Sequence, residues 1–138
     1  MINKAKLEEI KEICWLFVQN TQQLMQHKRY KLKNEVLCKK LKTAGDVYLT
    51  YDDSLFQWGC SGFVITSTGI YAKFDFAEPE YVPFEWLAQL KSCDELEVSD
   101  KYKIKAKGKL VAFSTGATVE FNRIIHVLYR DIIYVLHK

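Results

Sequence analysis

The sequence predicts an α+β fold in which helices come first, an antiparallel sheet follows, and one long helix ends the chain. Three observations support this class. Apolar residues recur every three or four positions up to residue 45, alternate with polar residues in short runs between 46 and 113, and return to helical spacing after 118. With 138 residues and 49% hydrophobic content, the chain can bury one core without a disulfide or metal. We therefore expect one compact unit.

Residues 1–45 predict two helices that pack together as a hairpin. The first apolar stripe predicts a helix over residues 4–26, with Asn3 as its N-cap. After the basic stretch 27–30, a second stripe predicts a helix that ends near Gly45, because glycine commonly stops a helix. The two stripes consist of Leu7, Ile10, Cys14, Phe17, Val18 and Met25, and of Leu32, Val36, Leu37 and Leu41.

Residues 46–113 predict a meander of short antiparallel strands built around a β-hairpin at 62–76. The runs 63–66 and 70–76 are rich in β-branched and aromatic residues, and Gly69 between them can take the positive φ of a tight turn. In the second run, Ile70, Ala72, Phe74 and Phe76 would share one face.

The remaining strands of the meander are predicted on both sides of this hairpin. A strand over 47–51 should precede it, and residues 55–58 are compatible with a further short strand. Pro79 and Pro83 limit residues 80–86 to an edge strand plus a helical turn, because proline lacks the N–H of a sheet ladder. Strands at 96–99, 102–106 and 110–113 would complete the meander, with Gly108 in the last hairpin turn.

Residues 118–137 form the longest predicted helix. An apolar stripe runs along it, but other apolar residues make the segment hydrophobic nearly all round, so it needs cover on two sides. One side would be the sheet. The other would be the N-terminal helices, whose Trp15 and Leu16 would otherwise be exposed, or a second copy of the chain. The stripe consists of Phe121, Ile125, Leu128, Ile132 and Val135 or Leu136.

Charge is segregated along the chain although its formal net value is only +3. Residues 1–45 hold ten Lys and Arg against four Asp and Glu, residues 46–100 hold two against eleven, and residues 101–138 hold eight against two. The blocks carry about +6, −9 and +6 by this count. Such blocks either pair with one another in the fold or present surfaces of opposite sign to partners.

Three segments resemble, in the same order, those of small bacterial and phage-borne pleckstrin-homology-like (PH-like) proteins: YLTYDDSLF (48–56), GFVITSTGIY (62–71) and VPFEW (82–86). In that fold an antiparallel meander curves into a barrel that one C-terminal helix closes. The resemblance covers residues 46–136, leaves the helical hairpin at 1–45 outside, and implies a non-enzymatic binding module at 46–138. PH-like domains usually hold a peptide, a protein surface or an anionic head group, and for this chain we expect protein–protein contact. A small chain of this kind, which consists of a domain without a linker, would also suit a phage or mobile-element inhibitor of a host complex.

Two surfaces are candidates for partner binding. If residues 101–107 form a strand, Lys101, Lys103, Lys105 and Lys107 project from one face, with Lys109 after the turn. This lysine strip either keeps a solvated sheet from associating or binds an anion such as nucleic acid or a phospholipid head group. The second candidate is a helical interaction face, for an unknown protein partner or a homodimer, that consists of Trp15, Arg123 and Arg130.

The sequence offers no catalytic constellation, metal site or cofactor motif. Asp52 and Asp53 are expected in a turn, because adjacent strand residues point to opposite faces. No histidine has a carboxylate or cysteine at ligand spacing; the histidines are His27, His126 and His137. The cysteines lack a C-x-x-C pair and predict free, mostly buried thiols; they are Cys14, Cys38, Cys60 and Cys93. No apolar run reaches membrane-spanning length and the start does not look like a signal peptide, so a cytoplasmic location is expected.

Overall fold

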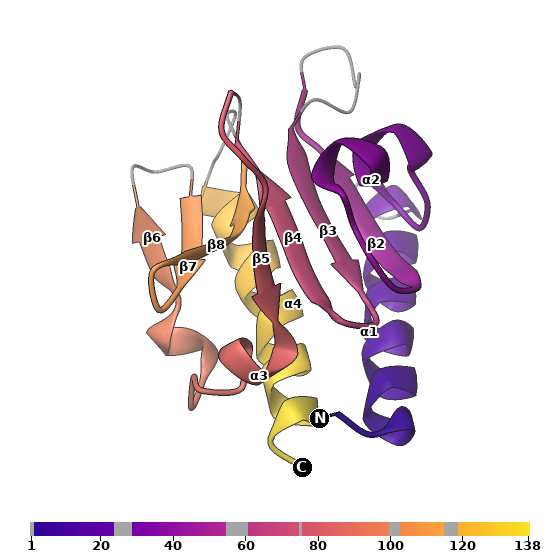
Figure 1. Ribbon diagram of the computed structural model, residues 1–138. Helices are drawn as coiled ribbons and strands as arrows, with labels where there is room; N and C mark the ends of the chain where they lie inside the picture. Colours follow the sequence, from indigo (N-terminus) through magenta and orange to yellow (C-terminus); the bar gives the residue numbers. More distant parts are fainter. Residues whose placement is uncertain (1, 24–28, 55–60, 75, 100–102, 115–118) are drawn as a thin grey trace.

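The computed structural model describes residues 2–23, 29–54, 61–74, 76–99, 103–114 and 119–138 (Figure 1). Its helices and antiparallel strands confirm the predicted α+β class, including the long C-terminal helix. The elements in chain order are α1 (Lys4–Gln23), β1 (Tyr30–Lys31), α2 (Glu35–Leu41), β2 (Val47–Asp52), β3 (Gly62–Thr66), β4 (Gly69–Lys73), β5 (Glu80–Pro83), α3 (Phe84–Leu87), the 3-10 turn η1 (Cys93–Glu95), β6 (Glu97–Ser99), β7 (Lys103–Ala106), β8 (Lys109–Phe113) and α4 (Val119–Leu136).

The larger sheet has five antiparallel strands in the order β1-β2-β3-β4-β5. Its centre is the predicted hairpin of β3 and β4, in which Phe63 lies opposite Ala72 and Ile65 opposite Ile70. Gly69 has a φ of +158°, and a Cβ at this position would clash with the carbonyl oxygen of Val82. Glycine is therefore required where β5 pairs closely with the start of β4.

The predicted barrel closure is wrong, because the described strands form two sheets rather than one closed sheet. The second sheet has three strands in the order β6-β7-β8 and lies beside β5 (Figure 1). Between the two sheets, the Leu110 N–H donates to the Glu80 carboxylate at 3.3 Å. A side chain of β5 therefore accepts a hydrogen bond from the backbone of β8 where the two sheets meet. Pro79 precedes β5 and Pro83 is its last residue, and β5 is an edge strand of the larger sheet, as predicted.

Helices cover the larger sheet on both faces. Phe63 and Ile65 belong to a core cluster with buried residues of α1 and α4, whereas Val64, which points the other way, packs with Leu37 and Leu41 of α2. The predicted packing of the first two helices as a hairpin is therefore wrong, since they lie on opposite faces. The reason is β1, which pairs along the edge of β2 and carries the chain around the sheet.

The long helix α4 is covered on two sides, as its composition predicts. Its stripe is buried, and so are Tyr129 and Ile133. One neighbour is the sheet and the other is α1, which runs antiparallel to it (Figure 1). At the end of this pair, the Lys6 ammonium donates to the carbonyl oxygen of Leu136 at 3.2 Å.

Local signals place most element ends close to where the sequence predicts them, with two differences. The second helix begins at Glu35 rather than Leu32, because the Asn34 side chain accepts from the N–H of Leu37 at 3.1 Å and caps it there. The strand β4 ends at Lys73, and Phe76 is fully exposed instead of joining the core face. Predicted residues 55–58 and 101–102 lie outside the described part of the chain.

A buried polar network forms at the far end of β2. The Tyr51 hydroxyl lies 3.0 Å from Ser114 Oγ and 3.2 Å from Asp53 Oδ1. Asp52 Oδ1 accepts from the N–H of Ser54 at 3.0 Å. The predicted turn at this acidic pair is wrong, because Asp52 is the last residue of β2 and the N–H of Asp53 still donates to the carbonyl oxygen of Ser61 at 3.0 Å. Burial raises the pKa of Tyr51 to about 12, against the weaker lowering effect of the Ser114 hydrogen bond.

Replacing Phe76 with glycine should stabilise the fold. Phe76 has a φ of +63°, a left-handed conformation that strains residues with a Cβ, and its exposed ring gains nothing from burial. After the extra entropy of an unfolded glycine is subtracted, we expect a gain of roughly 0.5 kcal/mol in the free energy of unfolding. Urea denaturation measures it, with Phe76→Ala as the matched control that keeps the strain. A loss of stability in the glycine variant would show that the ring contributes packing.

Stability should fall as the pH rises from about 10 to about 12, because of Tyr51. In this window the unfolded phenol has lost its proton while the folded one keeps it, so the unfolded state binds fewer protons and gains relative stability. Burial raises the pKa of Tyr30 and Tyr129 in the same direction. Urea midpoints across this range should decline less steeply in Tyr51→Phe than in Tyr134→Phe, which alters an exposed ring. Equal declines would contradict the assignment.

Candidate binding groove

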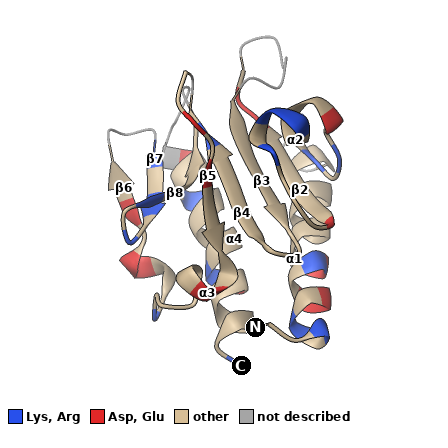
Figure 2. Cartoon of the chain, viewed as in Figure 1, with Lys and Arg blue, Asp and Glu red and all other residues tan. Residues whose placement is uncertain are grey.

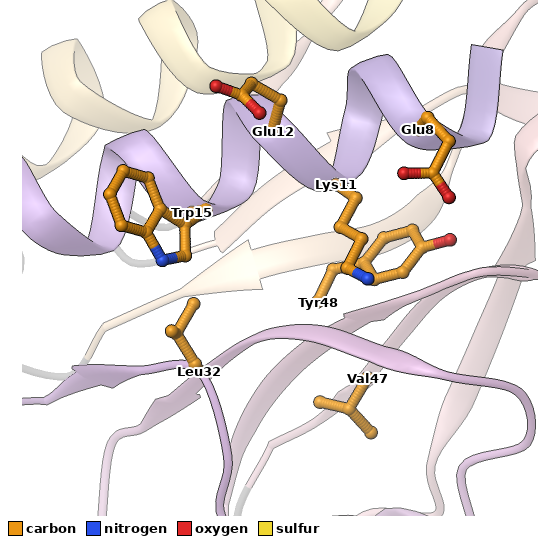
Figure 3. A pocket seen from close by; sticks show the side chains of 7 residues that line it. All are labelled: Glu8, Lys11, Glu12, Trp15, Leu32, Val47 and Tyr48. Atoms are coloured by element: carbon orange, nitrogen blue, oxygen red, sulfur yellow. The ribbon is translucent and has the colours of Figure 1, made fainter. Parts of the chain in front are cut away.

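A groove of about 500 Å³ lies between α1 and the start of β2 (Figure 3). We call it the α1/β2 groove. One wall comes from α1, and the opposite side comes from β2 and from the residue that follows β1. Its lining combines large apolar side chains with charges at the rim. The lining residues are Glu8, Lys11, Glu12, Trp15, Leu32, Val47 and Tyr48.

The helical repeat of α1 accounts for the first wall. Ile10, Cys14 and Val18 follow three- to four-residue steps and are fully buried beneath the helix. The residues 8, 11, 12 and 15 follow the same steps on the neighbouring face, so they form a row that borders the groove (Figure 3). Figure 2 shows both signs of charge along this helix. The burial of one stripe thus places the other stripe at the groove.

Trp15 is the most conspicuous member of that row. Its side chain is 48% exposed, and the adjacent Leu16 is 45% exposed. The prediction that packing against the C-terminal helix would hide them is wrong, because α1 meets α4 through its other face. Trp15 therefore presents aromatic surface beside the groove, and tryptophan is enriched among the residues that contribute most at protein interfaces.

The opposite wall is an open sheet edge. The two residues of β1 pair only with Thr50 and Tyr51, and no described strand continues this pairing alongside Val47 and Tyr48. After β1 the chain turns away at Leu32, whose side chain borders the groove. The first half of β2 therefore has a described neighbour on its β3 side alone, where the register shifts between Val47 and Leu49. Such edges can accept another strand.

Acidic side chains outnumber basic ones in the lining of the groove, which contains Glu8 and Glu12 against Lys11. Burial raises the pKa of Tyr48, and the carboxylates of Asp46 and Glu8 raise it further by disfavouring a phenolate. Lys11 partly offsets these charges, and Figure 3 shows its amine end beside the Tyr48 ring. The groove is therefore suited to a ligand that combines apolar surface with positive charge.

A second hollow of about 420 Å³ lies at the same edge of β2 and shares Leu32 and Val47 with the α1/β2 groove. We call it the α2-side hollow, because α2 contributes to its lining. Burial raises the pKa of the Cys38 thiol in it, which keeps this group protonated. The full lining is Leu32, Lys33, Asn34, Glu35, Cys38, Gly45, Asp46 and Val47.

The predicted lysine strip is only partly continuous. Lys103 and Lys105 alternate with buried residues of β7, as predicted, but Lys107 lies in the following turn with a φ of +48°. The described lysines also have neighbours of their own. The ammonium of Lys103 lies 4.5 Å from the centre of the Phe74 ring, that of Lys109 lies 4.4 Å from a ring of Trp86, and Lys105 pairs across the strands with Glu97. Lys101 lies outside the described residues.

The predicted helical interaction face is divided between two places. Trp15 borders the α1/β2 groove, whereas Arg123 and Arg130 are exposed on α4, which does not line that groove. Arg130 forms an ion pair with its neighbour Asp131 at 3.1 Å. Sequence reasoning selected Trp15 but missed Glu8, Glu12 and the residues of β2, because only folding brings these segments together.

The groove lining carries acidic, basic and aromatic side chains. In the part of the chain that the structure describes, no three His, Cys, Asp or Glu side chains gather closely enough to hold a metal ion. Within the same residues, no helix combines the length and the apolar character needed to cross a lipid bilayer. Three described cysteines are free thiols, of which Cys14 is buried. What the groove presents is shape, apolar surface and negative charge.

Comparison of the chain with protein-family models, with curated proteins and with solved structures finds no match. The geometry of the α1/β2 groove is therefore the basis for a functional assignment.

The lysines of β7 and β8 should differ in their contribution to stability. Lys109→Gln should lower the free energy of unfolding by about 0.5–1 kcal/mol, because it removes the cation from the Trp86 ring. Lys107→Gln is the control, since Lys107 is exposed in a turn and should change nothing measurable. Urea denaturation of both variants measures the difference. Equal effects would mean that the ring contact contributes no stability.

Proposed function

We propose that this protein is a non-enzymatic binding module that holds another protein in the α1/β2 groove. The observation that carries the proposal is Trp15, a half-exposed aromatic side chain that faces an open sheet edge across a groove of about 500 Å³. Tryptophan is among the residues that contribute most at protein interfaces, and it does so in pockets that exclude water. The neighbouring Leu32, Val47 and Tyr48 supply apolar surface for such a contact.

A PH-like relationship is the finer part of this proposal. The support for it is the order of antiparallel strands followed by one long helix that packs on the sheet. Domains of that kind hold partners on a rigid scaffold and rarely catalyse reactions. Acting as a phage or mobile-element inhibitor that occupies a host complex is one role that such a module would serve.

Charge favours a protein partner over nucleic acid or an anionic lipid. The carboxylates of Glu8 and Glu12 border the groove, and phosphate groups would be repelled there. In the lysine strip, Lys103 and Lys109 contact aromatic rings and Lys105 lies opposite Glu97. Anion binding by the lysine strip is therefore the second candidate function. This alternative would be favoured if the chain bound DNA or anionic vesicles in a salt-sensitive way and the double variant Lys103→Gln, Lys105→Gln lost that binding.

Affinity capture tests the proposed function. The full chain is immobilised and exposed to lysate of the source cells, in parallel with Trp15→Glu and with Tyr134→Glu, which changes an aromatic side chain that is 69% exposed on α4. Proteins that bind the groove should be retained by the parent and by the Tyr134 variant but not by the Trp15 variant. With a purified partner, the Trp15 change should weaken affinity by about 30-fold or more.

Other results of the affinity capture would exclude the groove or identify a different occupant. Equal retention by all three proteins would exclude the groove as the binding site. Light scattering on the parent and on Trp15→Glu identifies self-association, because a dimer that dissociates in this variant would make a second copy the occupant. Circular dichroism and a urea midpoint for each variant show that a loss of binding does not arise from unfolding.

A further inference from the structure

The two hollows described above lie at one sheet edge, and this arrangement specifies how a partner would bind. We infer that the first half of β2 takes up an extended, basic segment of a partner protein as an added β-strand. The inference rests on the proposed function, because it concerns the mode of binding and the partner chemistry at the same groove.

The backbone of β2 supports strand addition. In the β1–β2 pair, Lys31 lies opposite Thr50, and the N–H of Asp52 donates to the carbonyl oxygen of Arg29 at 3.3 Å. Backbone groups that point toward one neighbour recur every second residue in a regular strand, so Tyr48 follows Thr50 at that edge. Tyr48 also lies within the register shift between Val47 and Leu49, where the regular ladder of β2 ends. Because β1 stops at Lys31, an extended segment has room to continue its ladder.

The placement of the hollows matches the side-chain alternation of a strand. The α1/β2 groove and the α2-side hollow share Leu32 and Val47, and the helices α1 and α2 lie on opposite faces of the sheet. Successive residues of an added strand point to opposite faces. One residue would therefore enter the groove beside Trp15, and the next would enter the hollow beside Cys38.

Charge specifies a basic segment. The linings of the two hollows together contain four carboxylates and two ammonium groups. One of those ammonium groups, on Lys33, already pairs with Glu35 at 3.3 Å. Lys11 is the other, and it lies on the groove wall between Glu8 and Glu12. A partner segment with a large apolar residue for Trp15 and a Lys or Arg two positions away would match this lining.

The same charges argue against a second copy as the occupant. If two molecules paired their β2 edges, each would bring the same acidic rim, with Glu8, Glu12 and Asp46 close to their own counterparts. Such like-charge juxtaposition opposes association. A basic strand from a different protein is attracted by the same carboxylates that would repel a second copy.

A random peptide display library tests the inference. Peptides are selected on the immobilised full chain, and those that still bind Trp15→Glu are discarded. The expected survivors share an apolar residue and a Lys or Arg at alternate positions and lack proline between them. The best peptide is then synthesised with N-methyl groups at successive single positions. Methylation at every second residue should weaken binding about tenfold or more, because it blocks a ladder hydrogen bond, while the intervening positions should change little.

Charge variants provide matched controls on the same synthetic peptide. Glu12→Gln should weaken binding and reduce its salt dependence, whereas Lys11→Met should strengthen binding by removing a like charge from the groove. Each change should be a few-fold, as expected for partly exposed charges. Tyr134→Glu should bind as the parent does.

Several results would overturn strand addition. These are the absence of any Trp15-dependent peptide, an N-methyl pattern without alternation, acidic selected peptides, or a β2-edge dimer in solution. If affinity capture still finds a Trp15-dependent protein partner, the proposed function stands and only the binding mode is refuted. If neither peptide nor protein depends on Trp15, both are refuted.

Discussion

The burial of one face of the β3–β4 hairpin beneath α1 and α4 is the interaction on which the rest of the structure depends. Phe63, Ile65 and Ile70 project from that face into a cluster with Ile10 and Cys14 of α1. Full burial of each such side chain contributes roughly 1.5–3 kcal/mol, so this layer outweighs any polar contact in the molecule. Because α1 is held by this one stripe, its neighbouring stripe is directed outward over the start of β2, and Trp15 remains exposed there.

The two-residue strand β1 explains both the topology and the groove. Its pairing with Thr50 and Tyr51 carries the chain from the α1 face of the sheet to the α2 face. Aromatic packing supports this short pairing, since the ring centres of Tyr30 and Tyr51 lie 4.6 Å apart. The same shortness leaves the first half of β2 without a described neighbour on that side. A longer β1 would protect this edge and remove the groove.

Charge in the folded molecule is organised differently from charge along the chain. The basic C-terminal block places Lys103 and Lys109 over aromatic rings and Lys105 opposite Glu97, whose carboxylate offsets part of the positive charge of the lysine strip. The first block is basic by count, yet its Glu8 and Glu12 are the residues that border the groove. A net charge summed over a segment therefore says little about the sign of a particular surface.

The sequence by itself determined which residues of each element are apolar and where most elements begin and end. Helical spacing in α1 and α4 and alternation in the β3–β4 hairpin identified most of the core, because periodicity depends only on local backbone geometry. The tertiary structure decided what each apolar face meets: that α2 lies across the sheet from α1, that the strands form two sheets instead of a barrel, and that Trp15 lines one groove with Val47 and Tyr48. These outcomes depend on contacts between residues far apart in the chain, and a local period carries no information about such partners.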